Sequence, residues 1–111
     1  MTVTSIKEEQ GRTVIALSGE IDLENAGDVR KALLAALKHK KDVLVDLSAV
    51  SYIDSSGIAS LVEGLQVARK QKNELSLVAV SARALRVLEL ARLDKVFSIH
   101  PDIASAIAAR P

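Results

Sequence analysis

The chain has 111 residues, a formal net charge of +1 and no cysteine. Its 15 Lys and Arg against 14 Asp and Glu create no overall field for nucleic acid or an anionic membrane, and 2% aromatics leave little to stack on bases. The missing thiols exclude thiolate catalysis, zinc–thiolate sites and disulfides, which is compatible with a reducing compartment. Length and a 49% hydrophobic content predict one domain over residues 1–111, with an aliphatic core.

The N-terminal part of the chain predicts a hairpin followed by a helix. Thr2–Lys7 and Arg12–Ser18 are rich in β-branched residues, as strands are, and Gln10-Gly11 lies where the turn is expected. The next apolar residues recur at helical spacing, with Asn25 as the expected N-cap. This helix ends in the basic run Lys38–Lys41, which we interpret as cations that complement the helix dipole and not as a nucleic-acid site.

The centre of the chain predicts a buried strand and a second helix. The short, nearly continuous apolar run Asp42–Leu47 is typical of a strand covered on both faces, so we place it centrally. The residues expected in the buried stripe of the second helix are Ile58, Leu61, Val62, Leu65 and Ala68. Those expected off the stripe are Ala59, Ser60, Glu63, Gly64 and Val67. A second basic cluster begins at Arg69, at the end of this helix. We interpret it in the same way, as cations that complement the helix dipole.

The last part of the chain alternates strand and helix. The apolar run Leu75–Val80 predicts a buried strand. Ser81 is expected to cap a helix whose inward residues are Leu85, Leu88 and Ala91. A short strand is predicted at Val96–Ile99, and Pro101 is expected to open a terminal helix. The whole order predicts an α/β fold: a mixed, mostly parallel sheet of about five strands with about four helices.

The junction between the central strand and the second helix is polar and contains Asp54, Ser55, Ser56 and Gly57. A helix N-terminus offers unpartnered N–H groups and the positive end of the dipole, so an anionic group attached to a serine would be accommodated there. Asp54 is a candidate cap for the same amides. Gly57 either relaxes the steric demand at the helix start or lets a partner approach closely. These residues alone leave both a cap and a switch open.

Other kinds of site lack the residues that they need. The serines are not in Gly-x-Ser-x-Gly, and His39 and His100 form no catalytic set and no pair of metal ligands. We therefore expect no enzyme activity, no metal and no cofactor, and a nucleotide-binding module ranks last because there is no phosphate loop. No apolar run approaches the ~20 residues of a membrane span, and the polar N-terminus is unlike a signal peptide, so we expect a cytoplasmic protein.

The stretch Asp46–Gly64, DLSAVSYIDSSGIASLVEG, resembles the signature of STAS domains, in particular the bacterial anti-sigma factor antagonists. Weaker matches are Ser18–Asp22 before the first helix and Leu93–Phe97 near the end. Element order and length agree with that family over almost the whole chain. The resemblance implies a STAS-like fold that binds a partner protein.

The resemblance also implies a phosphorylation switch. In the family, the unmodified antagonist binds a partner that is both anti-sigma factor and serine kinase, and so releases a sigma factor. Phosphorylation of the second serine, Ser56 here, breaks the association, and a phosphatase reverses it. The other residues that the resemblance places on the partner-facing surface are Asp22, Asp54, Ser55, Gly57, Ala59 and Glu63. The alternative is a small STAS subunit that docks on a lipid-transport ATPase without a phosphoswitch.

Overall fold

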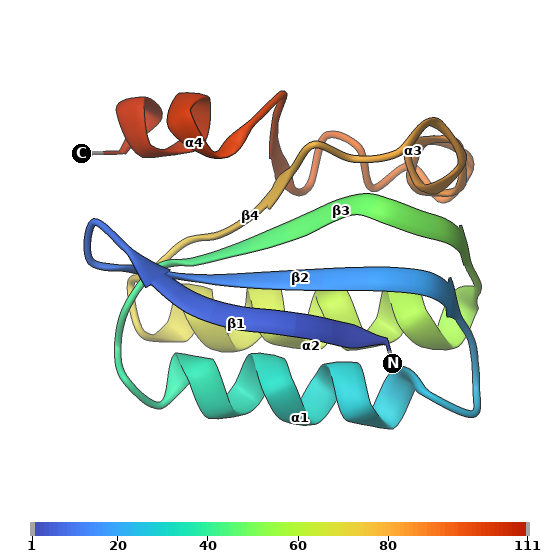
Figure 1. The fold of residues 1–111 in the computed structure, drawn as a ribbon, viewed down its shortest axis with the longest axis horizontal. Helices are drawn as coiled ribbons and strands as arrows, with labels where there is room; N and C mark the ends of the chain where they lie inside the picture. Colours follow the sequence, from blue (N-terminus) through green and yellow to red (C-terminus); the bar gives the residue numbers. More distant parts are fainter. Residues whose placement is uncertain (1, 111) are drawn as a thin grey trace.

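The computed structural model describes residues 2–110, and within them five strands form one sheet in the order β1-β2-β3-β4-β5 (Figure 1). The elements are β1 (Val3–Glu9), β2 (Arg12–Ile21), α1 (Ala26–Leu37), β3 (Val43–Ile53), α2 (Ser55–Lys70), β4 (Leu75–Val78), α3 (Ala82–Leu90), β5 (Ser98–His100) and α4 (Ile103–Ala109). β1 is antiparallel to β2, and the other neighbouring strands are parallel. The predicted mixed, mostly parallel α/β arrangement is confirmed.

The hairpin at the start of the chain turns at Gln10 and Gly11. Both residues have positive φ, 49° and 83°, as the two central positions of a type I′ turn require. The strands then pair from Glu9↔Arg12 onward, which leaves β1 at one edge of the sheet. The predicted turn is confirmed.

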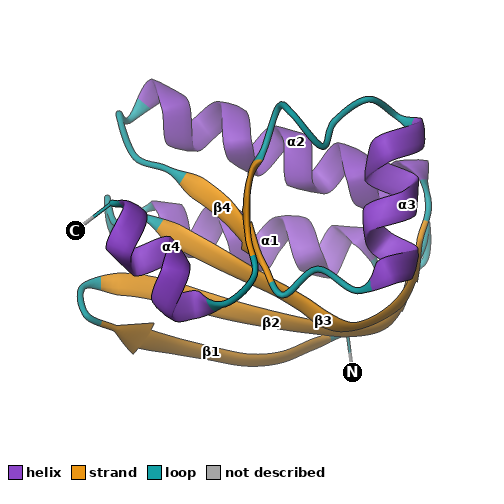
Figure 2. Cartoon of the chain, turned by 90° about the horizontal axis from the view of Figure 1, so that it is seen from above, coloured by secondary structure: helices purple, strands orange, loops and turns teal. Residues whose placement is uncertain are grey.

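Helices cover both faces of the sheet. α1 and α2 lie side by side on one face, α4 lies on the other, and α3 crosses the end at which β3 finishes (Figures 1 and 2). Because strand side chains alternate, Ile15 and Val45 join the larger core under α1 and α2, whereas Val14 and Leu44 join a smaller cluster with Ala106 of α4. No helix within residues 2–110 is long and apolar enough to cross a membrane.

The central strand is longer than the sequence predicts. We expected it to end at Leu47, but β3 runs to Ile53, and its second half pairs with β2 through Gly19↔Val50 and Ile21↔Ile53. The prediction was wrong because exposed small residues interrupt the apolar run after Leu47, while the backbone continues in the sheet past two register shifts. The strand therefore carries the chain directly to Asp54.

The helix faces also differ in detail from the predictions. In α2, Ser60 and Gly64 are buried and Val62 is only half-buried, because this helix packs against α1 as well as the sheet. In α3, the inward residues are Ala84 and Leu88, whereas Ala91 is exposed. Ser81 caps α3 as expected. Its hydroxyl accepts the amide of Ala84 at 3.2 Å.

The last strand and the last helix begin later than expected. β5 starts at Ser98 because Val96 still belongs to the preceding turn, where its amide donates to Leu93. Pro101 does not open α4. The N-cap is Asp102, whose carboxylate accepts the amide of Ser105 at 2.7 Å.

Candidate functional site at the start of helix α2

Asp54 ends the central strand and caps α2. Its backbone is extended, and its carboxylate oxygen Oδ1 accepts the amides of Ser56 at 2.9 Å and Gly57 at 3.1 Å. These are amides that have no carbonyl partner within the helix. The capping role considered for Asp54 is therefore confirmed.

The same carboxylate also holds the Ser56 side chain. The Ser56 hydroxyl donates to Asp54 Oδ1 at 2.5 Å, and this bond, followed by those from the Gly57, Ser56 and Leu23 backbone amides, keeps the pKa of Asp54 below its ordinary value although partial burial raises it. Asp54 is thus ionised at neutral pH. Because the hydroxyl hydrogen is directed at Asp54, the lone pairs of Ser56 Oγ remain free to react with an electrophile.

Gly57 is turned toward the core. A Cβ atom built on it would lie 2.6 Å from Cγ1 of Ile53 and 2.7 Å from Cγ2 of Ile21, both well inside normal contact distance. The glycine is thus needed because the helix begins directly above the last residues of β2 and β3. Gly57 is buried and sets the position of Ser56, and its expected place on the partner-facing surface stays a prediction.

Asp22 lies in the β2–α1 connection, next to the same helix start. Its carboxylate accepts the Glu24 amide at 3.0 Å, and its own amide donates to Asn25 Oδ1 at 2.9 Å. Asn25 is the N-cap residue of α1, as predicted, but its side chain makes no capping bond, because it bonds back to the Asp22 amide and to the Glu20 carbonyl. The two connections are joined where the Asp54 amide donates to the Ile21 carbonyl at 3.0 Å.

Ala59 and Glu63 follow Ser56 along α2. Ala59 is exposed, whereas Glu63 is half-buried and forms an ion pair with Arg30 of α1 at 2.8 Å. The Arg30 hydrogen bonds hold the pKa of Glu63 below its ordinary value. Glu63 thus lies at the seam between two helices, with its charge already balanced within the chain.

Ser60 fastens the helix start to α1. Its hydroxyl donates to the Ala26 carbonyl at 3.0 Å, and the side chain is buried. Helical spacing alone placed Ser60 off the buried stripe. One sequence signal for an inward hydroxyl was available. A serine within a helix can donate its hydroxyl to the backbone carbonyl four residues earlier, and Ser60 does so to the Ser56 carbonyl at 3.2 Å.

Two exposed apolar side chains flank the junction and were missed by sequence reasoning. Tyr52 is 48% exposed near the end of β3, and Leu23 is 83% exposed in the β2–α1 connection. Tyr52 could have been recognised from strand alternation, because Ile53 next to it is buried, had the strand been extended that far. Leu23 carries no such signal, since a loop has no periodicity.

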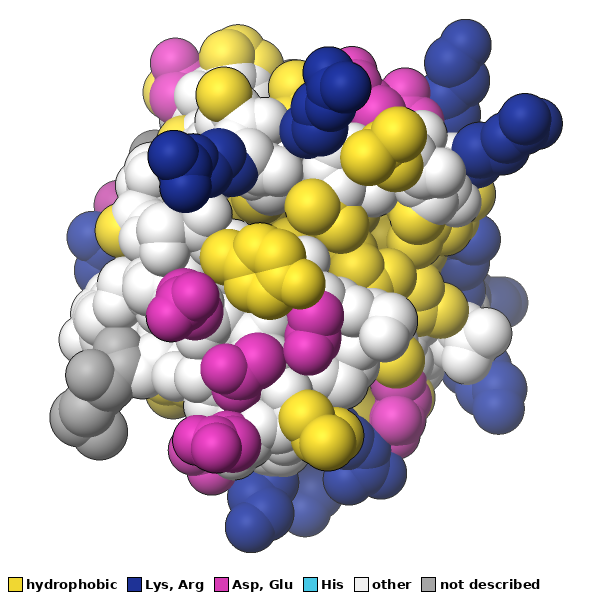
Figure 3. Space-filling model, turned by 90° about the vertical axis from the view of Figure 1, so that its right-hand side faces the viewer, with side chains coloured by type: hydrophobic (Ala, Val, Ile, Leu, Met, Phe, Trp, Pro, Cys, Tyr) yellow, Lys and Arg dark blue, Asp and Glu magenta, His cyan; other side chains and the backbone are white. Residues whose placement is uncertain are grey.

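The face that carries the junction is acidic. No Lys or Arg occurs between Thr13 and Val29 or between Asp42 and Ala68, so the connections at this end supply carboxylates without cations of their own. Figure 3 views this end and shows acidic side chains gathered beside a large hydrophobic one, with Lys and Arg around the rim. Exposed apolar groups with an acidic surround suit a protein partner.

His39 and His100 lie away from this site, one beyond the C-terminus of α1 and the other in β5. Among residues 2–110 no group of three or more His, Cys, Asp or Glu side chains is placed to hold a metal ion. Ser56 therefore has a carboxylate neighbour but no histidine base at the junction.

Comparison with solved structures identifies the same fold. An anti-sigma factor antagonist from Mycobacterium paratuberculosis superposes with a TM-score of 0.85 at 28% identity, over 95% of this chain and 90% of that one. SpoIIAA, an anti-sigma factor antagonist, has the fold at 17% identity, with TM-scores of 0.78 for the unphosphorylated form and 0.73 for the phosphorylated Bacillus form. These alignments cover 95% and 96% of this chain and 93% and 98% of theirs.

Sequence comparison agrees. An anti-sigma-B factor antagonist of Listeria monocytogenes is 34% identical over 86 residues, which cover 77% of this chain and 75% of the relative. The family model described as "Mlab, STAS domain" matches residues 4–101, almost the whole described part of the chain. The similarity to STAS domains therefore covers almost the whole chain and not only the stretch around Asp54–Gly57. The chain belongs to the STAS domain family.

Proposed function

We propose that the chain is an anti-sigma factor antagonist, a binding module that sequesters an anti-sigma factor through the surface around Ser56. The observation that carries this proposal is the placement of Ser56 between an acidic, partly apolar surface and the capping carboxylate of Asp54. The names of the relatives favour it over a subunit of a lipid-transport ATPase. A partner of this kind acts where bacterial transcription occurs, in the cytoplasm.

The partner that we propose is an anti-sigma factor with serine-kinase activity, and Ser56 is its phosphate acceptor. The chain then serves as substrate and ligand and performs no catalysis itself. A free lone pair on Ser56 Oγ attacks the γ-phosphorus of ATP in the kinase site, the bond to the leaving ADP oxygen breaks, and the hydroxyl proton passes to a base. A phosphoserine phosphatase reverses the modification by hydrolysis.

Phosphorylation switches binding without unfolding the domain. A phosphate adds about −1.5 to −2 charges at neutral pH, and the helix N-terminus tolerates them. A partner surface fitted to a neutral hydroxyl beside Asp54 instead meets added bulk and added negative charge. A loss of about 3 kcal/mol there weakens binding roughly a hundredfold.

The partner-facing surface that we propose contains Asp22, Asp54, Ser55, Ser56, Ala59 and Glu63. Tyr52 and Leu23 extend it as apolar contacts, and Tyr52 is the main anchor because tyrosine is enriched among the few residues that contribute most of the binding energy of an interface. Gly57 contributes indirectly by holding Ser56 in place.

The test combines modification and binding. The purified chain is mixed with the kinase-type anti-sigma factor of the same organism and Mg-ATP, the phosphate is located by mass spectrometry, and the affinity is measured by calorimetry. We expect one phosphate on Ser56, an affinity about a hundredfold lower for Ser56→Asp, and unchanged but unregulated binding for Ser56→Ala. Ser5→Asp is the matched control, with the same change at an exposed position of β1 that lies outside the proposed surface. Phosphate elsewhere, or tight binding by Ser56→Asp, contradicts the site.

A further inference from the structure

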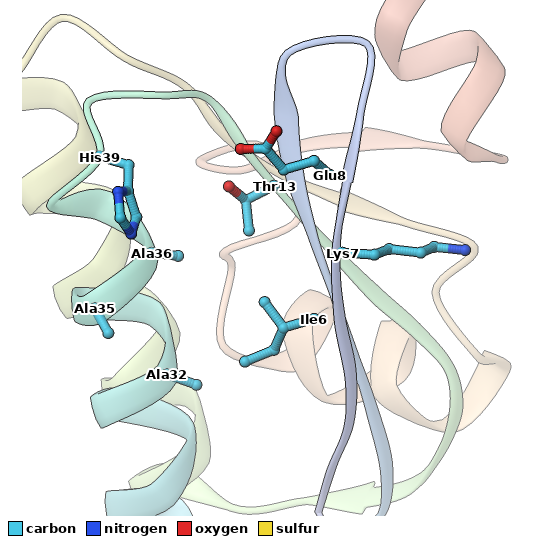
Figure 4. Close-up of a pocket in the computed structure, with 8 residues that line it drawn as sticks. All are labelled: Ile6, Lys7, Glu8, Thr13, Ala32, Ala35, Ala36 and His39. Carbon is cyan, nitrogen blue, oxygen red and sulfur yellow. The ribbon is translucent and has the colours of Figure 1, made fainter.

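A polar pocket lies at the end of the molecule opposite the Ser56 junction, where the β1–β2 hairpin meets the ends of α1, α2 and α4 (Figures 1 and 2). Its volume is about 560 Å³. The neighbouring groove between β1 and α1, where Ile6 faces the alanines of the helix, is mainly apolar by comparison (Figure 4). Charged side chains from segments far apart in the sequence line the polar pocket: Arg12, Lys40, Lys41, Asp42 and Arg110.

Two of these cations are already balanced by carboxylates. Arg110 forms an ion pair with Asp42 at 2.6 Å, and the other carboxylate oxygen of Asp42 accepts the Glu74 amide at 2.9 Å. Lys41 forms an ion pair with Glu8 of β1, whose side chain is drawn in Figure 4. The Asp42 carboxylate is therefore taken up by its own partners and does not cancel the remaining positive charge of the pocket.

Arg12 is the first cation whose charge stays uncompensated. Its guanidinium donates to the carbonyl oxygens of Gln10 at 2.6 Å and Ile107 at 3.5 Å, and also to that of Arg110. These acceptors are neutral, and no carboxylate within residues 2–110 forms an ion pair with Arg12. Because a guanidinium has five N–H donors, some stay available to a ligand. A cation that is already held in one orientation loses little entropy when it binds an anion.

Lys40 is the second uncompensated cation. Its side chain is exposed and forms no ion pair within the described part of the chain. Its φ of 59° lies in the left-handed region, where glycine is the favoured residue. The helix dipole does not account for a lysine here, because α1 ends at Leu37 and the effect of the dipole falls off within the last turn. Lys40 thus supplies charge to the pocket at a position that disfavours its backbone.

We propose that this pocket binds the dianionic phosphate group of a small phosphate monoester. Arg12 and Lys40 supply two unbalanced positive charges, and a phosphate monoester carries about −1.5 to −2 charges at neutral pH. The planar guanidinium of Arg12 also matches the spacing of two phosphate oxygens. The volume leaves room for a polar body, whose hydroxyl groups suit the side-chain amides of Gln10 and Asn73 in the lining. The site is separate from the Ser56 surface and does not depend on the antagonist function.

A titration followed by ¹H–¹⁵N NMR tests the site with glucose 6-phosphate as the probe. It is carried out at about pH 8, where the phosphate is dianionic because its second pKa is about 6. We expect saturable shifts of the amides of Gly11, Arg12, Lys40 and Asn73. Glucose 6-sulfate, which has a similar shape and one negative charge fewer, should bind about tenfold more weakly, and glucose itself should cause no saturable shifts.

Lys40→Gly separates the ligand contact from the stability of the fold. Because glycine tolerates the positive φ, this variant should be at least as stable to urea as the wild type, yet bind glucose 6-phosphate about tenfold more weakly. Lys72→Gly is the matched control, since Lys72 follows α2 with a φ of 64° but does not line the pocket. Its affinity should stay close to that of the wild type, because salt screens exposed charges outside the site.

The outcomes that overturn the site are equally specific. They are shifts that do not saturate, shifts centred on other elements, binding of the sulfate ester as tight as that of the phosphate ester, and equal losses of affinity in Lys40→Gly and Lys72→Gly. Lys40→Asn, which also tolerates a left-handed backbone, replaces Lys40→Gly if that variant loses its native spectrum.

Discussion

Ser56 Oγ lies 2.5 Å from the Asp54 oxygen that also accepts the first amides of α2. The proposed phosphate acceptor and the helix cap thus share one atom. A phosphoryl group on Ser56 removes the hydrogen that this bond uses and brings about −1.5 to −2 charges beside the carboxylate. Modification at Ser56 is therefore expected to be felt by Asp54 as well as by a partner protein.

The pKa of Asp54 reports this coupling. In the unmodified chain we expect it below the ordinary value of about 3.9, closer to that value in Ser56→Ala, and higher again after phosphorylation. Since the folded pKa is the lower one, the stability contributed by Asp54 is present above its unfolded pKa and is lost as the pH falls through the folded pKa. A ¹³C NMR titration of the side-chain carboxyl measures each value.

Asp102 is the internal control for that titration. Its pKa is also lowered, but by Ser105 at the start of α4, so it should be the same in wild type and Ser56→Ala. If Asp54 titrates identically in the two proteins, the hydroxyl is not bonded to it in solution.

Gly57→Ala should destabilise the fold by about 1–3 kcal/mol, because the new methyl group overlaps Ile53 and Ile21. Gly27→Ala is the matched control at an exposed position of α1 with nothing within 4 Å of the new atom, and it should be neutral or stabilising by up to about 1 kcal/mol. Urea unfolding measures both. Equal effects at the two sites would contradict the close contact.

Ser60→Ala removes the buried hydrogen bond between α2 and the Ala26 carbonyl. We expect a loss of about 1 kcal/mol in the free energy of unfolding, since the carbonyl loses a side-chain donor. Ser55→Ala, the same change at an exposed position in the first turn of α2, should stay within about 0.5 kcal/mol. A loss no larger for Ser60→Ala than for Ser55→Ala would mean that the hydroxyl does not fasten the helices.

Tyr52→Ala separates binding from stability. The half-exposed ring contributes little to the core, but as an interface anchor its loss should weaken partner binding by about 2 kcal/mol, or roughly thirtyfold. Val96→Ala is the control, because Val96 is also exposed but contacts Arg69 in the last turn of α2, the opposite end of that helix. Calorimetry with the anti-sigma factor should show normal affinity for the control. Normal affinity for Tyr52→Ala would remove it from the interface.

Hydrophobic periodicity and local residue chemistry were sufficient to predict most of the fold from the sequence. The type I′ turn, the cap at Asp54 and the alternation of strands and helices each follow from residues close together in the chain. The extent of β3 does not, because pairing with β2 keeps Ser48–Ser51 in the sheet where their own side chains predict an interruption. Tertiary pairing outweighs local propensity there.

In the candidate site, too, only the local features could be predicted from the sequence. The capping role of Asp54 could be predicted because a cap involves only the next two or three residues. The inward position of Gly57 could not, since it depends on Ile21, which is distant in sequence and adjacent only after β2 and β3 have paired. The polar pocket beside Arg12 was equally hidden, because it exists only where the hairpin meets the ends of α1, α2 and α4.

The order of strands in the sheet matches their order along the chain, and this has a consequence for how the molecule forms. Each strand pairs with the one made just before it, so a growing chain can assemble the sheet as it leaves the ribosome. The Ser56 junction needs only β2, α1, β3 and α2, all of which end by Lys70. Of the later elements, α3 crosses the end of β3, where the Ser81 hydroxyl donates to the Val50 carbonyl at 2.6 Å. β5 and α4 are added along the opposite edge, where insertions and substitutions can accumulate without moving Ser56.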